Sequence, residues 1–128
     1  NKRNEPYEKL DFITINRYGN ATQKVTATHQ NFPGKPIFLS EVGIKQIGGG
    51  ADASLNEELV AELKQLKNYP YLIGFSLWAY NDYRSNYKGT PKSGYREWGI
   101  VNQYREKKAA YYQLKDIFNF WLTPTIKE

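Results

Sequence analysis

The sequence predicts an α/β fold in which parallel strands alternate with helices. Three short apolar runs, rich in β-branched and aromatic residues, have the character of buried strands. They begin about 26 and 35 residues apart, and the segments between them carry apolar residues at helical spacing. Strands that alternate with helices at such distances are typical of right-handed parallel βαβ units.

The three expected strands cover residues 10–15, 36–39 and 71–78. Each run is nearly continuously apolar, which is the pattern of parallel strands covered on both faces. A turn rich in proline and glycine at residues 32–36 introduces the second strand. We therefore expect both faces of the sheet to be covered.

A helix is expected after each strand. The first, over residues 21–31, is the weakest, because it contains several β-branched residues. For the second, Ser54 and Glu57 predict a capping box, in which the hydroxyl accepts a first-turn amide proton and the carboxylate reaches back. Pro70 then prevents its continuation. The apolar stripes of the second and third helices are Leu55, Leu59, Val60, Leu63 and Leu66, and Ala110, Leu114, Ile117 and Trp121.

A free sheet of three parallel strands would leave two apolar edges open. Eight βα units close into a barrel of roughly 250 residues, so we expect residues 1–128 to form the last three βα units of a (β/α)8 TIM barrel. The absence of methionine, including an initiator, predicts that the chain is part of a longer protein. A small doubly wound sheet is the alternative, but the glycines at 48–50 lack the ending of a phosphate loop and predict a flexible hinge or lid.

Composition excludes several classes of function. The chain has no cysteine and one histidine, His29, which leaves no thiolate or all-histidine metal site, and we expect no metal and no cofactor. No stretch approaches the roughly 20 apolar residues of a membrane span, so no membrane partner is expected. The net charge is +5, but the basic residues are scattered along the chain, which argues against a nucleic-acid partner.

Polar residues follow the expected strands at 16–19, 40–43 and 80–84. The carboxyl ends of strands line the active face of a parallel barrel. The strongest indication of a functional site is Glu41, a single carboxylate that follows an apolar strand. Burying a carboxylate costs free energy unless the group is hydrogen-bonded or has a function. On the residues alone, an ion pair with Arg17 or Arg96 remains a structural alternative.

Four motifs occur in order along the chain. They are DFITINRYG at residues 11–19, KPIFLSEVG at 35–43, GFSLWAYNDYR at 74–84 and REWGIV at 96–101. This ordered set resembles the sixth strand, the nucleophile strand, the eighth strand and the closing loop of the catalytic barrel of glycoside hydrolase family 2. That family includes β-galactosidases, β-glucuronidases and β-mannosidases.

The resemblance implies specific roles for three residues. Glu41 would be the catalytic nucleophile, and Tyr18 would donate a hydrogen bond that keeps its carboxylate ionised and aimed. Trp78 would form the floor of the sugar subsite and precede a non-proline cis peptide, Trp78–Ala79. The resemblance also implies hydroxyl recognition by Asn16, Asn81 and Asp82. The rim of the site would be shaped by Arg84, Arg96 and Trp98, for which packing of the long loop is an equal alternative.

A retaining glycosidase needs two carboxyl groups about 5–5.5 Å apart. The family places its acid/base glutamate in an Asn-Glu pair on the fourth strand, which this sequence does not contain. The pair Asn56-Glu57 lies in the expected capping box, and Asp82 is a weak substitute because it lies four residues past Trp78. We therefore expect a parent protein that hydrolyses β-glycosides with retention, while this chain alone is inactive.

The expected partners are a carbohydrate substrate and either the remainder of the barrel or a second copy paired through the open strand edges.

Three alternative functions remain open. A non-catalytic carbohydrate-binding module would use the same aromatic residues without needing Glu41. A single-stranded nucleic-acid binder would need a clustered basic groove. A barrel glycosidase of a neighbouring family is a further alternative. Family analogy favours a periplasmic or extracellular location, and the sequence itself leaves the compartment open.

Overall fold

The computed structural model describes residues 7–124. After a short 3-10 turn (η1, Tyr7–Lys9), strands and helices alternate, and a small hairpin interrupts the last connection. The elements are β1 (Ile13–Tyr18), α1 (Ala21–Asn31), β2 (Ile37–Gly43), α2 (Glu57–Leu66), β3 (Leu72–Leu77), β4 (Tyr83–Arg84), β5 (Tyr95–Arg96) and α3 (Ala109–Leu122). This order confirms the predicted alternation of strands and helices.

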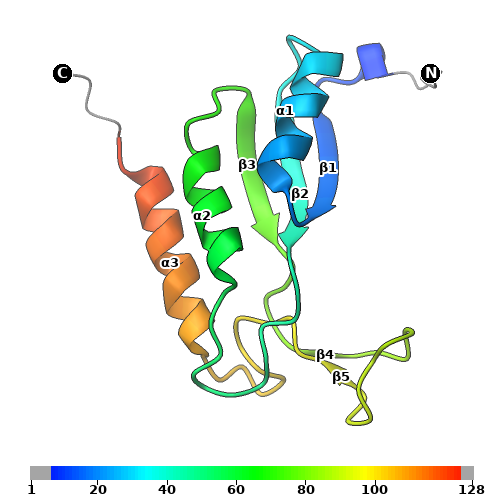
Figure 1. Ribbon diagram of the computed structural model, residues 1–128, viewed down its shortest axis with the longest axis vertical. Helices are drawn as coiled ribbons and strands as arrows, with labels where there is room; N and C mark the ends of the chain where they lie inside the picture. The colour runs from blue at the N-terminus through cyan, green and yellow to red at the C-terminus, as the bar shows by residue number, and fades with distance from the viewer. Residues whose placement is uncertain (1–6, 125–128) are drawn as a thin grey trace.

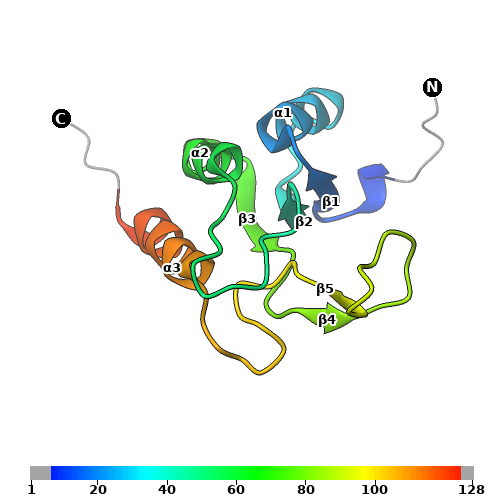
Figure 2. The same cartoon turned by 60° about the horizontal axis from the view of Figure 1, so that its bottom comes forward.

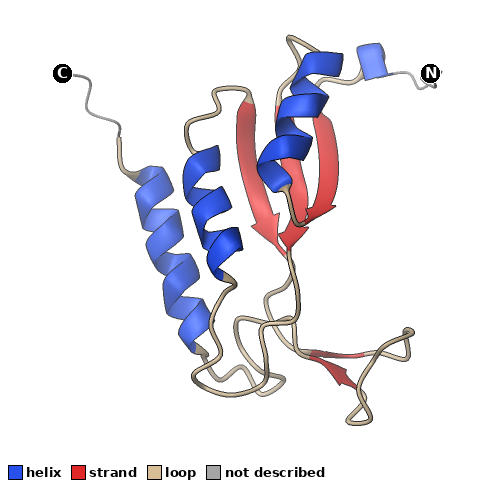
Figure 3. Ribbon diagram, viewed as in Figure 1, coloured by secondary structure: helices blue, strands red, loops and turns tan. Residues whose placement is uncertain are grey.

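The three main strands form a parallel sheet in the order β1-β2-β3. The strands run side by side toward the same end of the molecule, and the antiparallel β4–β5 hairpin lies beyond that end (Figures 1 and 3). The helices form an arc on one side of the sheet, with α2 between α1 and α3 (Figure 2). This is a small α/β unit compatible with part of a barrel, and it brings the polar strand ends together.

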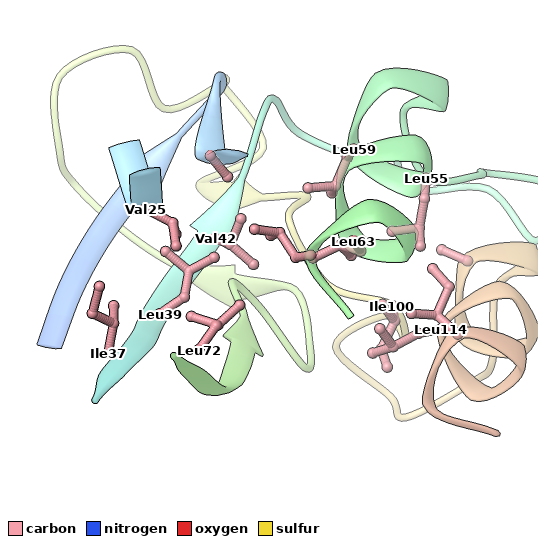
Figure 4. Packing of buried hydrophobic residues seen from close by; sticks show 14 of the residues in the cluster. Val25, Ile37, Leu39, Val42, Leu55, Leu59, Leu63, Leu72, Ile100 and Leu114 are labelled. Carbon is pink, nitrogen blue, oxygen red and sulfur yellow. The ribbon is translucent and has the colours of Figure 1, made fainter. Parts of the chain in front are cut away.

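The core lies between the sheet and the helices. Leu39 and Val42 of β2 point toward Val25 of α1 and Leu63 of α2, while Ile100 and Leu114 fill the space beside α3 (Figure 4). The predicted stripes are confirmed by the burial of Leu55, Leu59, Leu63 and Leu66, and of Ala110, Leu114 and Ile117. Because one apolar cluster joins all three strands and helices, the sheet is held rigidly by its covered face.

The opposite face of the sheet differs from expectation. Thr14, Asn16 and Ser76 are exposed there, and β1 alternates between exposed and more buried residues. No helix within residues 7–124 covers this face (Figure 2). The apolar runs predicted strands covered on both faces, whereas within residues 7–124 one face is covered and β1 has the period-2 burial that goes with it.

Two strand boundaries also differ from the prediction. β1 begins at Ile13 rather than Leu10, and both Leu10 and Phe12 are more than two-fifths exposed. β2 continues to Gly43, so Glu41 lies within the strand and not after it. A prediction from apolar residues alone ends these two strands too early, because their polar ends, residues 16–18 and 41–43, are still paired in the sheet.

The predicted capping box at Ser54 and Glu57 was wrong. The N-cap of α2 is Asn56, whose Oδ1 accepts hydrogen bonds from the amides of Glu58 and Leu59. The Ser54 hydroxyl instead donates to the carbonyl of Asp52. Both residue types cap helices, so the local sequence could not decide between them.

The glycine-rich loop after β2 is anchored, contrary to the expected hinge. The amides of Ile47 and Gly48 donate to the carbonyl of Glu97 at 2.9 and 3.1 Å. A Cβ at Gly49 would lie 2.7 Å from Glu97 Oε2, so the loop packs directly on that carboxylate. The loop thereby braces the segment that carries Trp98.

Candidate active site

The centre of the site is a hydrogen bond between two neighbouring strands. The Tyr18 hydroxyl at the end of β1 donates to Glu41 Oε2 of β2 across 2.6 Å. Such a short O–H···O distance is typical of a charged acceptor. The bond orients one carboxylate oxygen, while the side chain of Glu41 remains partly exposed.

An irregular register brings the two side chains together. Ile15 pairs with Leu39, whereas Asn16 pairs with Glu41, so Ser40 is an extra residue on β2. Such a bulge changes the direction in which the following side chains point. Ser40 Oγ donates to Asn16 Oδ1 at 2.6 Å and stabilises the irregular step.

Aromatic residues from the third connection surround the tyrosine. Trp98 makes an edge-to-face contact with Tyr18, with ring centroids 5.6 Å apart, and Trp78 makes another with Tyr83 at 5.9 Å. The Trp78 indole also donates from Nε1 to the Tyr83 hydroxyl at 3.0 Å. A pocket of about 230 Å³ is lined by Tyr18, Trp78, Tyr83, Arg96 and Trp98. It is smaller than the roughly 300–1,000 Å³ of drug-sized sites and suits a single small ring.

Gly43 allows these groups to converge. A Cβ at this position would lie 3.2 Å from the Trp98 ring, 3.3 Å from the Trp78 carbonyl and 3.4 Å from the Tyr18 ring. The peptide bond from Trp78 to Ala79 is cis, as the resemblance implied. The sequence showed Gly43 only as the end of a motif, and its close contacts come from residues far along the chain.

The environment of Tyr18 favours its neutral form. Desolvation of the phenol is the largest effect, and the hydrogen bond and negative charge of Glu41 add to it, so the pKa of Tyr18 is raised above its ordinary value of 10.0. The phenol is therefore a permanent hydrogen-bond donor to the carboxylate at neutral pH.

Three other predicted site residues have partners of their own. Asn16 lies beside Glu41 in the sheet and is held by Ser40. Asn81 donates from Nδ2 to the backbone carbonyl of Asp82 at 2.7 Å, and Arg84 donates from Nε to the Tyr95 hydroxyl at 3.2 Å. Asn16 thus lies beside the nucleophile candidate, while Asn81 and Arg84 make contacts that organise the loop.

Asp82 is placed differently from the expected substrate contact. Its side chain is 2% exposed and forms an ion pair with Lys108, with Oδ1 2.7 Å from Nζ. The same oxygen accepts a hydrogen bond from the Gly99 amide at 2.9 Å. We correct the expectation that Asp82 recognises sugar hydroxyls, because its charge is buried and already neutralised. The same burial agrees with the sequence argument that Asp82 is a weak substitute for the acid/base group.

The sequence motifs assigned no role to Tyr83, and for Arg96 packing of the long loop was an equal alternative. The structure places both on the pocket, because Tyr83 and Arg96 form the first pair of the β4–β5 ladder. The role of Lys108 was missed altogether, since it stands beside the exposed Lys107 and carries no local signal of burial.

Within residues 7–124, no group of three or more His, Cys, Asp or Glu side chains is placed to hold a metal ion. No helix in the same part of the chain has the length and apolar character needed to cross a membrane.

Comparison with known proteins supports the architecture. No family model and no curated protein matches the chain. Among solved structures, a β-D-glucuronidase from Dictyoglomus thermophilum matches with a TM-score of 0.67 at 20% identity, covering 94% of this chain and 24% of that one. The chain shares its fold with part of this enzyme.

Two further structures show the same relationship. A GH2 β-galacturonidase from Eisenbergiella tayi, bound to galacturonate, matches with a TM-score of 0.63 at 24% identity, covering 85% of this chain and 23% of that one. A β-glucuronidase from Bifidobacterium dentium, complexed with coumarin-3-O-glucuronide, matches with a TM-score of 0.61 at 23% identity. The match covers 91% of this chain and 21% of that one. The chain spans about a quarter of the length of these enzymes.

Proposed function

We propose that the chain is the C-terminal part, the last three βα units, of the (β/α)8 catalytic domain of a retaining β-glycosidase. Its contribution to the reaction is the nucleophile Glu41. The observation that carries the proposal is the 2.6 Å hydrogen bond from Tyr18 to Glu41, made beside a pocket walled by two tryptophans. The shared fold with part of two β-glucuronidases and a β-galacturonidase agrees with it.

In the first chemical step, the free oxygen of Glu41 attacks the anomeric carbon of a bound β-glycoside. The carbon–oxygen bond to the leaving group breaks, and that oxygen takes a proton from a carboxylic acid. Asp82 is buried against Lys108 and unsuited to this role, so we expect the acid to lie on the remainder of the barrel. Water then cleaves the glycosyl–Glu41 ester, which gives overall retention.

Tyr18 acts as a positioning residue in this scheme. It donates to one oxygen of Glu41 and leaves the other available, and its raised pKa keeps the proton on the phenol. Trp78 is 37% exposed and can stack on the apolar face of a sugar ring. The Trp98 ring packs edge-on against Tyr18 and limits the movement of the phenol.

The proposal is tested first with the 128-residue chain on 4-nitrophenyl β-glucuronide and β-galactoside. We expect no turnover, because protonation of the leaving group has no donor in the site described here. Clear turnover that Glu41→Gln abolishes would show that the acid/base group lies in this chain.

The second test uses the longer parent enzyme. Glu41→Gln should lower kcat about a thousandfold or more, because an amide cannot replace a carboxylate nucleophile. The matched control is Glu57→Gln, an exposed glutamate at the start of α2, which should keep its activity. Full activity of Glu41→Gln would show that Glu41 is not the nucleophile, whereas sugar binding that the substitution leaves intact, in a parent without hydrolytic activity, would favour a carbohydrate-binding module.

A further inference from the structure

The β4–β5 hairpin, residues 83–96, concentrates positive charge. It contains four basic residues, Arg84, Lys88, Lys92 and Arg96, and no acidic residue. The hairpin therefore carries a charge of +4, against +5 for the whole chain of 128 residues. Basic residues occur all along the sequence, but most of the excess positive charge lies in this one hairpin.

Two of these cations, the arginines, lie against tyrosine rings. The guanidinium of Arg84 lies 5.1 Å from the centre of the Tyr95 ring, and that of Arg96 lies 5.4 Å from the Tyr87 ring. Within residues 7–124 the structure has one ion pair, between Lys108 and Asp82. A guanidinium stacked on a ring still presents N–H donors at its edge, and its planar fork suits carboxylate and sulfate oxygens.

The hairpin begins at the sugar pocket. Tyr83 and Arg96 are paired in its ladder and also line the pocket with Trp78 and Trp98. The ladder continues with Arg84 and Tyr95, and the connecting loop carries Lys88 and Lys92. A chain of sugars that leaves the pocket on this side would pass along a surface of tyrosine rings and cations.

We propose that this hairpin binds the acidic groups of a polymeric carbohydrate, the carboxylates of uronic acids or sulfate esters, whose neighbouring sugar occupies the pocket. The inference rests on the proposed function, since the pocket is taken to hold a sugar. A nucleic acid would meet the same cations, but its phosphates would also approach the carboxylate of Glu41, which is bonded to Tyr18 of the pocket wall. The arrangement of one carboxylate beside aromatic rings favours a carbohydrate.

The experiment measures binding of four probes to the 128-residue chain by calorimetry at low salt. The probes are an oligogalacturonide, a sulfated galactan oligosaccharide and a neutral galactan oligosaccharide of equal length, and a single-stranded oligothymidylate. The test variant is Arg84→Gln with Arg96→Gln. The matched control is Lys24→Gln with Lys64→Gln, two exposed lysines on α1 and α2 whose loss lowers the net charge equally. Circular dichroism checks that both variants stay folded.

We expect at least one acidic oligosaccharide to bind about tenfold or more tightly than the neutral one, because hydrogen bonds to charged groups are the stronger ones. That preference should be lost in the arginine variant and kept in the lysine variant, and the two acidic probes identify which group is recognised. Equal binding of acidic and neutral sugars, equal losses in both variants, or an oligothymidylate that binds as tightly as the acidic sugars would overturn the inference.

The same titrations separate this inference from the proposed function. Trp78→Ala should weaken every oligosaccharide, charged or neutral, because it removes the floor of the pocket. If Trp78→Ala has no effect while the arginine variant loses the acidic preference, the hairpin binds acidic glycans and the sugar pocket is wrongly assigned. If only Trp78→Ala weakens binding, the pocket stands and the hairpin proposal fails.

Discussion

Glu41 and Asp82 are both acidic residues near the carboxyl ends of neighbouring parallel strands, yet their surroundings are opposite. Glu41 is partly exposed, and its partner is the neutral hydroxyl of Tyr18. Asp82 is 2% exposed and bonded to a lysine ammonium and a backbone amide. We propose that the first has an oxygen available for chemistry, while the carboxylate of the second is held in an ion pair that fixes its loop.

The difference shows that position near a strand end is insufficient to identify a catalytic carboxylate. The buried pair of Asp82 and Lys108 ties the loop after β3 to the start of α3, and the Gly99 amide attaches the segment that carries Trp98. Asp82 thereby supports the segment that carries Trp98, whereas Glu41 is bonded to Tyr18, which lines the pocket. Variants at the two positions should separate stability from chemistry.

The largest expected effect on stability follows from Asp82→Ala. Removing this carboxylate leaves the Lys108 ammonium buried without its partner, and breaking a buried pair costs about 3–5 kcal/mol. We expect Glu41→Gln to change the free energy of unfolding by less than about 1 kcal/mol, because Tyr18 can still donate to the amide oxygen. Urea unfolding, followed by tryptophan fluorescence, measures both. Equal losses for the two variants would remove the distinction between them.

A smaller loss is expected for Gly99→Ala. A Cβ at this position would lie 2.3 Å from three backbone atoms, in Asn81, Asp82 and Val101, so the backbone has to shift. Overpacking of this kind costs about 1–3 kcal/mol. Gly50→Ala is the matched control, because its Cβ would meet no atom within 4 Å. Thermal unfolding of the two variants at the same temperature would contradict the close approach at Gly99.

Features of the fold and of the candidate site that depend on neighbouring residues could be predicted from the sequence, whereas features that depend on distant residues could not. The order of the elements follows from local apolar patterns, and the roles of Tyr18, Glu41 and Trp78 were hypotheses drawn from contiguous motifs. The structure brings the first two into contact and leaves their catalytic roles as proposals.

The supporting network could not be predicted in this way. Asp82 and Lys108 are 26 residues apart, and each stands among polar neighbours that suggest solvent exposure. The constraint on Gly99 exists only when segments 81–82 and 99–101 lie side by side. Burial of a charge is a property of the assembled fold, and neither residue carries it alone.

The smallest effect concerns the titration of Tyr18. Its folded-state pKa is raised above the unfolded value of 10.0, so the folded chain binds more protons than the unfolded chain once the pH passes about 10. Stability from this group is therefore complete below that pH and is lost as the pH rises. At about pH 11, Tyr18→Phe and the wild type should show equal phenolate absorbance near 295 nm. The reason is that Tyr18 of the folded wild type is still protonated at this pH and contributes no phenolate. A deficit of one phenolate among the eleven tyrosines would mean that Tyr18 titrates normally.

In the proposed reaction, the carboxylate of Glu41 reaches the anomeric carbon of a bound sugar. The most direct measurement treats the 128-residue chain with 2-deoxy-2-fluoroglycosyl fluorides of glucuronic acid and galactose, followed by peptide mass spectrometry. Fluoride leaves without protonation, so the step needs only the nucleophile: the bond from the Glu41 oxygen to C1 forms as the C1–F bond breaks. We predict one added fluorosugar on the peptide that contains Glu41, and none in Glu41→Gln. An unlabelled wild-type chain, or a label that persists in Glu41→Gln, would contradict the claim.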